Sequence, residues 1–330
     1  MRFGCRAAAT TACAWVALKK GLDMVRGNHW RDSAAWLLAC AAPAVAHACA
    51  CGCGVFDVAT SEMFPVSSGG MVYLEQDFMD QNQNWSGTSS APASANSDLR
   101  IRTNFWTLGG QYLFDRTWGV QVEVPYWERL FRTTDDSGAA ADFTHGALGD
   151  VRLKAFYTGL AADLSTGLSF GVKLPTGDST YPNFDPDTEI SSGSTDLLLG
   201  AYHLGALTRD NRFSWFASAQ WQQPIAHKAS YRPGAELDMV SGVYYAGWSF
   251  AAVRLTPLLQ VEGTYREHDG GPLGHPQDSG YTRLFVAPGL ELDAGRTRWY
   301  ADVSQAVYTN SSGNQLIART LFKVSVSVRF

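Results

Sequence analysis

The sequence predicts an all-β chain that folds as a transmembrane antiparallel up-and-down β-barrel of about 12 strands. Three observations predict this fold. Apolar and polar residues alternate in segments of about 10 residues, long enough for a tilted strand to cross a bilayer. Long polar loops alternate with short turns between these segments, as extracellular loops and periplasmic turns do in such barrels. No window holds an uninterrupted run of about 20 apolar residues, so no transmembrane helix is expected.

The last segment, 320–330, shows the clearest alternation. Phe322, Val324, Val326 and Val328 share one face, and lysine, serine and arginine side chains occupy the other. The chain then ends on Phe330. This segment resembles the terminal strand of bacterial outer-membrane barrels, which implies that Phe330 is an assembly signal for the barrel assembly machinery. The alternative is an edge strand of a soluble β-sandwich.

The preceding strands follow the same rhythm. Polar loops are expected at 80–99, 133–146, 175–195 and 268–280. An even number of strands places both termini of the chain on the periplasmic side. A closed barrel also leaves no unpaired strand edge in lipid. The predicted strands are 70–79, 101–114, 119–127, 148–157, 167–174, 196–204, 213–223, 237–247, 252–267, 281–293, 298–309 and 317–330.

Composition narrows the function classes. Aromatic residues make up 12% of the chain, which suits the two aromatic girdles of a membrane barrel. The net charge is -5, and residues 49–330 alone carry -9. This acidic balance argues against nucleic acid as a partner.

The N-terminal region predicts export to the bacterial outer membrane. An apolar run at 34–46 follows Arg26 and Arg31 and precedes the small-x-small cleavage pattern at 46–48, so residues 1–48 are predicted to be a signal peptide. Its basic region begins late, which makes Met24 an alternative start. Residues 49–69 form a Cys-rich segment, expected to be a short periplasmic tail or plug, and residues 70–330 form the barrel, in contact with outer-membrane lipid.

Three cysteines, Cys49, Cys51 and Cys53, fall within five residues directly after the predicted cleavage site. Thiolates are soft ligands suited to Cu(I) or Zn(II), and the glycines between them let a short loop surround an ion. Thiol redox or disulfide chemistry and lipidation of Cys49 are the open alternatives. A second hypothesis for the whole protein is therefore a barrel anchor that presents this segment to a periplasmic partner.

The polar faces of the predicted strands carry charges of both signs and are expected to face the lumen, because the opposite faces meet lipid. Two interpretations are open. The charges either pair with one another and fill a narrow barrel, or line a selective path for a small solute. The candidate lumen-lining residues are Glu123, Asp150, Arg152, Lys154, Lys173, Glu262, Arg266, Arg283 and Glu291.

Two motifs carry a family resemblance. K-L-P-T-G-D at 173–178 ends a predicted strand, and after a polar loop G-S-T-D-L-L-L-G follows at 193–200. Together they resemble the outer-membrane proteins of the meta-pathway phenol-degradation family. The resemblance implies a channel or transporter that passes a small, often hydrophobic solute. There is no H-E-x-x-H, and no histidine lies in a context that resembles an outer-membrane phospholipase, so an enzyme is not expected.

Overall fold

The computed structural model describes residues 69–135 and 138–330. The predicted signal peptide and the three clustered cysteines lie outside the described residues. Within them, no helix has the length and apolarity needed to span a bilayer. The helical element assigned there, η3 (Ala93–Ala95), is a single 3-10 turn.

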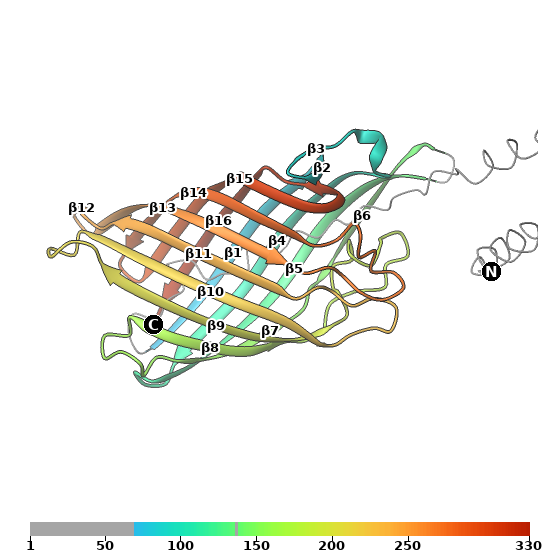
Figure 1. Ribbon diagram of the computed structural model, residues 1–330. Helices are drawn as coiled ribbons and strands as arrows, with labels where there is room; N and C mark the ends of the chain where they lie inside the picture. The colour runs from blue at the N-terminus through green and yellow to red at the C-terminus, as the bar shows by residue number, and fades with distance from the viewer. Residues whose placement is uncertain (1–68, 136–137) are drawn as a thin grey trace, which may run out of the picture. The chain divides into compact units, whose positions relative to one another are not determined.

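Twelve long strands form a closed antiparallel barrel in which each strand pairs with its neighbours in the chain and the last pairs with the first (Figure 1). This confirms the predicted fold class and strand number. The barrel strands are β1 (Gly69–Gln81), β4 (Asp98–Leu113), β5 (Trp118–Thr134), β7 (Arg152–Tyr157), β8 (Thr166–Lys173), β9 (Thr195–Ala206), β10 (Phe213–Ala226), β11 (Glu236–Tyr245), β13 (Val253–Arg266), β14 (Tyr281–Ala294), β15 (Thr297–Ile317) and β16 (Thr320–Arg329).

The barrel closes between β1 and β16. Their register runs continuously from Met71 opposite Arg329 to Met79 opposite Leu321. At the end of the seam, Gly70 N donates to Phe330 O at 3.0 Å and Phe330 N donates to Gly70 O at 2.9 Å. The wall therefore has no free edge at the place where the two termini of the barrel meet, as a lipid environment requires.

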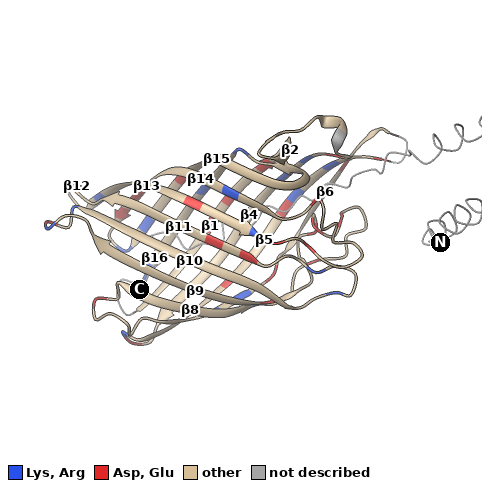
Figure 2. Cartoon of the chain, in the orientation of Figure 1, with Lys and Arg blue, Asp and Glu red and all other residues tan. Residues whose placement is uncertain are grey.

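The two faces of the wall differ in chemistry. On β16, Val324 and Val328 are exposed on the outside, whereas Lys323, Ser325 and Ser327 are buried inside. Figure 2 shows charged segments of both signs along the strands and in the loops. Large apolar side chains cover the outer face, as lipid contact demands. Exposed aromatic residues lie near the short-turn end (Tyr112, Phe114, Trp118, Phe213, Trp248, Phe250 and Phe330) and further along the strands (Trp106, Tyr126, Trp221, Tyr265, Tyr308 and Phe322).

The connections at the two ends of the barrel differ in length. Segments 82–97, 174–194, 227–235 and 267–280 join strands at one end, and short turns such as 114–117, 207–212 and 295–296 join them at the other. The start of β1 and the end of β16 both lie at the short-turn end, which is the periplasmic end in barrels of this kind.

Two predicted loops are wrong in part, because strand pairing continues past the end of the apolar alternation. Residues 133–146, predicted as a loop, mostly form a hairpin in which β6 (Ala140–Leu148) pairs with the end of β5. The predicted strand 148–157 is therefore interrupted at 149–151 and resumes as β7. Likewise, 80–99 contains β2 (Gln83–Gly87) and β3 (Ser89–Ser90), and β2 pairs with an extension of β15. A short β12 (Trp248–Phe250) pairs with the start of β13.

Deletion of Phe330 is expected to slow assembly of the barrel. The Phe330 ring packs directly on the backbone of Gly70, where an added Cβ would lie 2.4 Å from the ring. The deletion thus removes both this contact and the terminal aromatic residue. The check is the amount of folded protein in the outer membrane after a pulse of synthesis. Phe250→Ala removes an equally exposed ring and is expected to assemble normally; wild-type levels for the deletion would contradict the prediction.

Candidate solute site in the barrel interior

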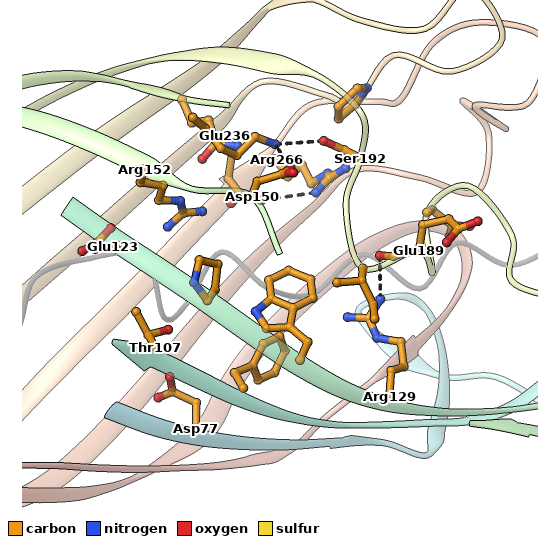
Figure 3. A pocket seen from close by; sticks show the side chains of 18 of the residues that line it. Asp77, Thr107, Glu123, Arg129, Asp150, Arg152, Glu189, Ser192, Glu236 and Arg266 are labelled. Carbon is orange, nitrogen blue, oxygen red and sulfur yellow. Dashed lines mark hydrogen bonds and ion pairs between the residues drawn. The ribbon is translucent and has the colours of Figure 1, made fainter. Parts of the chain in front are cut away.

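A cavity of about 150 Å³ lies inside the barrel (Figure 3). Side chains from β1, β4, β5, β7, β8, β10, β11 and β13 form its wall, and residues of segment 174–194 contribute to its lining. It is enclosed on part of its surface by Phe105, Pro125 and Trp127, with Phe105 and Trp127 in edge-to-face contact at 4.9 Å. Six of the nine predicted lumen-lining residues line this cavity, namely Glu123, Asp150, Arg152, Lys154, Lys173 and Arg266.

On one side of the cavity, the carboxylate of Glu123 accepts two hydrogen bonds and forms one ion pair. Tyr73 Oη donates to Glu123 Oε1 at 2.9 Å, and Gln121 Nε2 donates to the same oxygen at 2.7 Å. Lys154 Nζ lies 3.3 Å from Glu123 Oε2. These residues come from β1, β5 and β7, so the network connects β7 and its neighbour β5 to β1, which lies on the far side of β4, along the inner face.

A second network surrounds Lys173 at the end of β8. Its Nζ lies 2.8 Å from Asp196 Oδ2 and 3.4 Å from Asp150 Oδ2. It also donates to Ser192 Oγ at 2.8 Å. Asp150 in turn accepts a hydrogen bond from Ser191 Oγ at 2.5 Å. The interruption of the strand at 149–151 thus places Asp150 where it holds segment 174–194 against the inner wall.

A third group lies across the barrel around Arg266. Its guanidinium is 2.9 Å from Asp269 Oδ1 and 3.6 Å from Glu236 Oε2. Tyr231 Oη donates to Asp269 Oδ2 at 2.9 Å. The cavity is therefore bounded by ion pairs on opposite walls.

The other three predicted lumen residues are buried but do not line the cavity. Glu262 accepts hydrogen bonds from Gln260 Nε2 and Ser304 Oγ, both at 2.8 Å. Arg283 is 2% exposed and lies 3.8 Å from the centre of the Tyr281 ring. Glu291 pairs with Arg298 at 3.5 Å. The Glu291–Arg298 contact pairs opposite charges, as in the structural interpretation, whereas the contacts described for Glu262 and Arg283 are with neutral polar and aromatic side chains.

The feature that sequence reasoning missed is the inward course of segment 174–194. Arg129, on β5, is 1% exposed and donates from Nη1 to the carbonyl oxygens of Thr188 at 2.5 Å and Glu189 at 3.1 Å. Figure 3 shows Arg129 beside Glu189 at the cavity. The predicted strand ended at 127. Had it been extended, the inward parity of Gln121 and Glu123 would have placed Arg129 in the interior.

Aromatic contacts also hold this segment, nearer the long-loop end of the barrel. Phe184 packs edge-to-face on Phe131 at 5.8 Å, within a buried cluster that includes Ile101 and Leu316. Tyr181 stacks on His145 with ring centres 4.2 Å apart. The segment is thus attached both to the barrel wall and to the β5–β6 hairpin.

A hydrogen bond between His145 and Asp178 completes this attachment. His145 Nε2 lies 2.8 Å from Asp178 Oδ2. The hydrogen bond from His145 lowers the pKa of Asp178, so this carboxylate stays ionised at all pH values near neutrality. Asp178 belongs to the K-L-P-T-G-D motif, and the preceding Gly177 lies so close to the wall that a Cβ there would be 2.8 Å from Leu148 O.

Replacement of Arg129 by Met is expected to release segment 174–194 from the interior. We call the segment seated when it lies in the barrel interior as described above. Hydrogen bonds to a charged donor contribute about 2 kcal/mol, so the equilibrium constant between the seated and the released segment falls about 30-fold. Single-channel recording should then show more frequent or larger openings. Arg132→Met, on the same strand but in the exposed pair with Asp142, is the matched control and should leave the openings unchanged. Identical traces for both variants would refute the anchoring role.

The seating of this segment is also expected to depend on pH. Burial raises the pKa of Glu189 to about 7, from an ordinary value near 4.5. The seated state therefore holds a proton that the released state gives up, and seating weakens as pH rises from about 5 through 7. Openings should increase between pH 6 and pH 8 in wild type. Glu189→Gln should remove this dependence, and a dependence that survives in the variant would assign it to another group.

The part of the chain that the structure describes contains no cluster of three histidine, cysteine, aspartate or glutamate residues able to hold a metal ion. The predicted Cu(I) or Zn(II) ligands Cys49, Cys51 and Cys53 lie outside it. The sequence does contain one G-x-S-x-G, at 167–171. It lies on the regular strand β8 rather than in the strand-to-helix turn that exposes a nucleophilic serine.

Comparison with known proteins supports the fold. No family model and no curated protein matches the chain. Among solved structures, the COG4313 outer membrane channel from Pseudomonas putida F1 superimposes with a TM-score of 0.60 at 13% identity, over 83% of this chain and 100% of that one. The β domain of the Bordetella autotransporter BrkA gives a TM-score of 0.49 at 9% identity, over 80% and 100%. The chain therefore has the fold of a Gram-negative outer-membrane β-barrel.

Proposed function

We propose that this barrel is a channel or transporter that passes a small solute across the outer membrane. The observation that carries the proposal is the cavity inside a closed barrel, with a segment of chain folded into it. A barrel that served only as an anchor would need neither an interior space nor a segment held there by a buried arginine. The fold shared with the Pseudomonas putida F1 channel supports the same role.

The lining indicates a solute with both polar and apolar parts. Phe105, Pro125 and Trp127 offer an apolar wall, and paired charges face it. Small-molecule sites typically combine such an apolar lining with a few placed polar groups. The resemblance of 173–178 and 193–200 to the meta-pathway phenol-degradation proteins supports the same class of small, partly hydrophobic solute.

Ion conductance in planar bilayers tests the proposal. The chain from Cys49 to Phe330 is compared with one that starts at Gly69, after both have been shown to be folded by heat-modifiable electrophoresis. Conductance that appears or grows on deletion of 49–68 would make that segment a plug on a working channel. Folded barrels that neither conduct nor admit solutes in liposome swelling would overturn the proposal.

If the folded barrel neither conducts nor admits solutes, the leading function becomes that of a barrel anchor that presents the Cys-rich segment to a periplasmic partner. Metal analysis of the purified mature protein then decides whether the Cys-rich segment carries copper or zinc. A channel without that role retains no stoichiometric metal. Replacement of Cys51 and Cys53 by serine should abolish any metal that is retained and leave the barrel folded.

A further inference from the structure

The buried ionisable side chains of the barrel are predominantly acidic. Among the described residues, thirteen buried side chains carry a carboxyl group and four are cations. The buried cations are Arg129, Lys173, Arg283 and Lys323, and the buried carboxylates are Glu75, Asp77, Asp98, Glu123, Asp150, Glu189, Asp196, Glu236, Asp238, Glu262, Asp269, Glu291 and Asp302.

Partly buried cations reduce this excess but do not remove it. Arg152 lines the cavity, and Lys154, Arg266 and Arg298 pair with buried carboxylates. Counting all four still leaves eight cations against thirteen carboxylates. The cavity alone shows the same sign, with seven carboxylates and five cations in its lining.

The excess is greatest on the inner face around β16. Lys323 Nζ lies 3.3 Å from Glu75 Oε2 and 3.7 Å from Asp77 Oδ1, and Asp302 is its register partner on β15. Ser304 Oγ donates to Glu262 Oε2 at 2.8 Å and lies 3.3 Å from Asp302 Oδ1. Lys323 is therefore the one lysine in a group of four acidic side chains that are all at least nine-tenths buried: Glu75, Asp77, Glu262 and Asp302.

A neutral acceptor adds to the same group. Gln260 is 1% exposed, and its Nε2 donates to Glu262 Oε1 at 2.8 Å and lies 3.4 Å from Asp302 Oδ2. Its Oε1 is buried and accepts no hydrogen bond from the described residues. The amide oxygen thus joins the carboxylates as a further acceptor, which favours positively charged or hydrogen-bond-donating species in the lumen.

From these observations we infer that the lumen is selective for cations, so that the transported solute is a small organic cation or a neutral molecule rather than an anion. A narrow passage with low-dielectric walls and lining charge of one sign concentrates counter-ions about 10-fold or more. Bilayer lipid around the barrel supplies such walls. This inference rests on the proposed channel function and adds the charge class of its solute.

The reversal potential of the full chain in a KCl gradient tests the inference. At low salt and pH 8, the potential should have the sign of K⁺ permeation, with a K⁺ over Cl⁻ permeability ratio of about 10. The ratio should fall toward one at 1 M KCl, where charges are screened beyond about 3 Å. In liposome swelling, a small alkylammonium ion should enter faster than a carboxylate of the same size.

Matched variants assign the selectivity to the lining. Glu75→Gln with Asp77→Asn should lower the K⁺ over Cl⁻ ratio, and Lys154→Gln, which removes a lining cation, should raise it. Glu128→Gln removes a carboxylate from the exposed face of β5 and should change nothing. The opposite signs of the first two changes keep the test informative even if one variant folds poorly.

The outcomes separate the two proposals. Wild-type conductance that favours Cl⁻ or shows no preference would overturn the inference and leave the channel function standing. A ratio that responds equally to Glu128→Gln would also overturn it, because the outer face would then set the selectivity. A folded barrel with neither conductance nor solute entry would overturn both.

Discussion

Val326→Arg is expected to lower the free energy of unfolding of the barrel by about 2–4 kcal/mol, the cost of an arginine on the lipid face near the bilayer midplane. Val326 lies on the outer face of β16, between the exposed Val324 and Val328. Its cross-strand neighbours, Leu74 on β1 and Trp299 on β15, are also exposed.

Depth follows from strand geometry. Phe330 lies at the short-turn end of the barrel. Four residues at a rise of about 3.3 Å, on a strand tilted by about 40°, place Val326 about 10 Å deeper than Phe330. The apolar band of such barrels is about 25 Å tall, so its midplane is about 12 Å from its edge. The depth of Val326 is close to this value, and Val326 therefore lies near the midplane.

Urea unfolding in lipid vesicles, followed by tryptophan fluorescence, measures the effect. Val328→Arg is the matched control, because it places the same side chain on the same face only about 5 Å from Phe330. It is expected to cost about 1 kcal/mol. Equal stability for the wild type and Val326→Arg would mean that this face of β16 does not meet the lipid core.

Sequence reasoning predicted the barrel well because its signal is local. Lipid on one side and a polar lumen on the other impose a period of two on each strand, which a reader finds without knowing the partner strand. The alternation in 320–330 predicted correctly that Val324 and Val328 face outward and that Lys323 faces inward. The rhythm of long loops and short turns gave the strand number in the same way.

The parts that sequence reasoning missed depend on contacts between distant segments. β6 is held by backbone pairing with the end of β5, and its sequence, A-A-D-F-T-H-G-A-L, has no clear alternation. The inward course of 174–194 depends on Arg129, about 60 residues earlier in the chain. The sequence predicted which charged residues face the lumen. It did not predict which of them pair with one another, because those pairs depend on the strand register and on the closure of the barrel.

Lys323→Met is expected to be the most destabilising change in the lumen, at about 3 kcal/mol. Lys323 lies directly across from Asp77 on β1 and from Asp302 on β15, so one cation connects the three strands at the closure of the barrel. Methionine fills a similar volume but leaves these buried carboxylates without that cation. Removing one partner of a buried ion pair costs far more than the pair itself contributes, because the remaining charge stays desolvated.

A double-mutant cycle separates charge from packing. Adding Glu75→Gln to Lys323→Met removes one of the orphaned charges and should restore about 1 kcal/mol, whereas Glu75→Gln alone should destabilise the wild type. Lys154→Met removes a lysine whose ion pair is with Glu123 and should cost less than Lys323→Met. If Lys323→Met and Lys154→Met were equally stable, or if Glu75→Gln gave no rescue, the carboxylates around Lys323 would not be ionised in the folded barrel. The same result would remove the main source of the negative lumen potential, so the stability of this one variant bears directly on the charge of the solute.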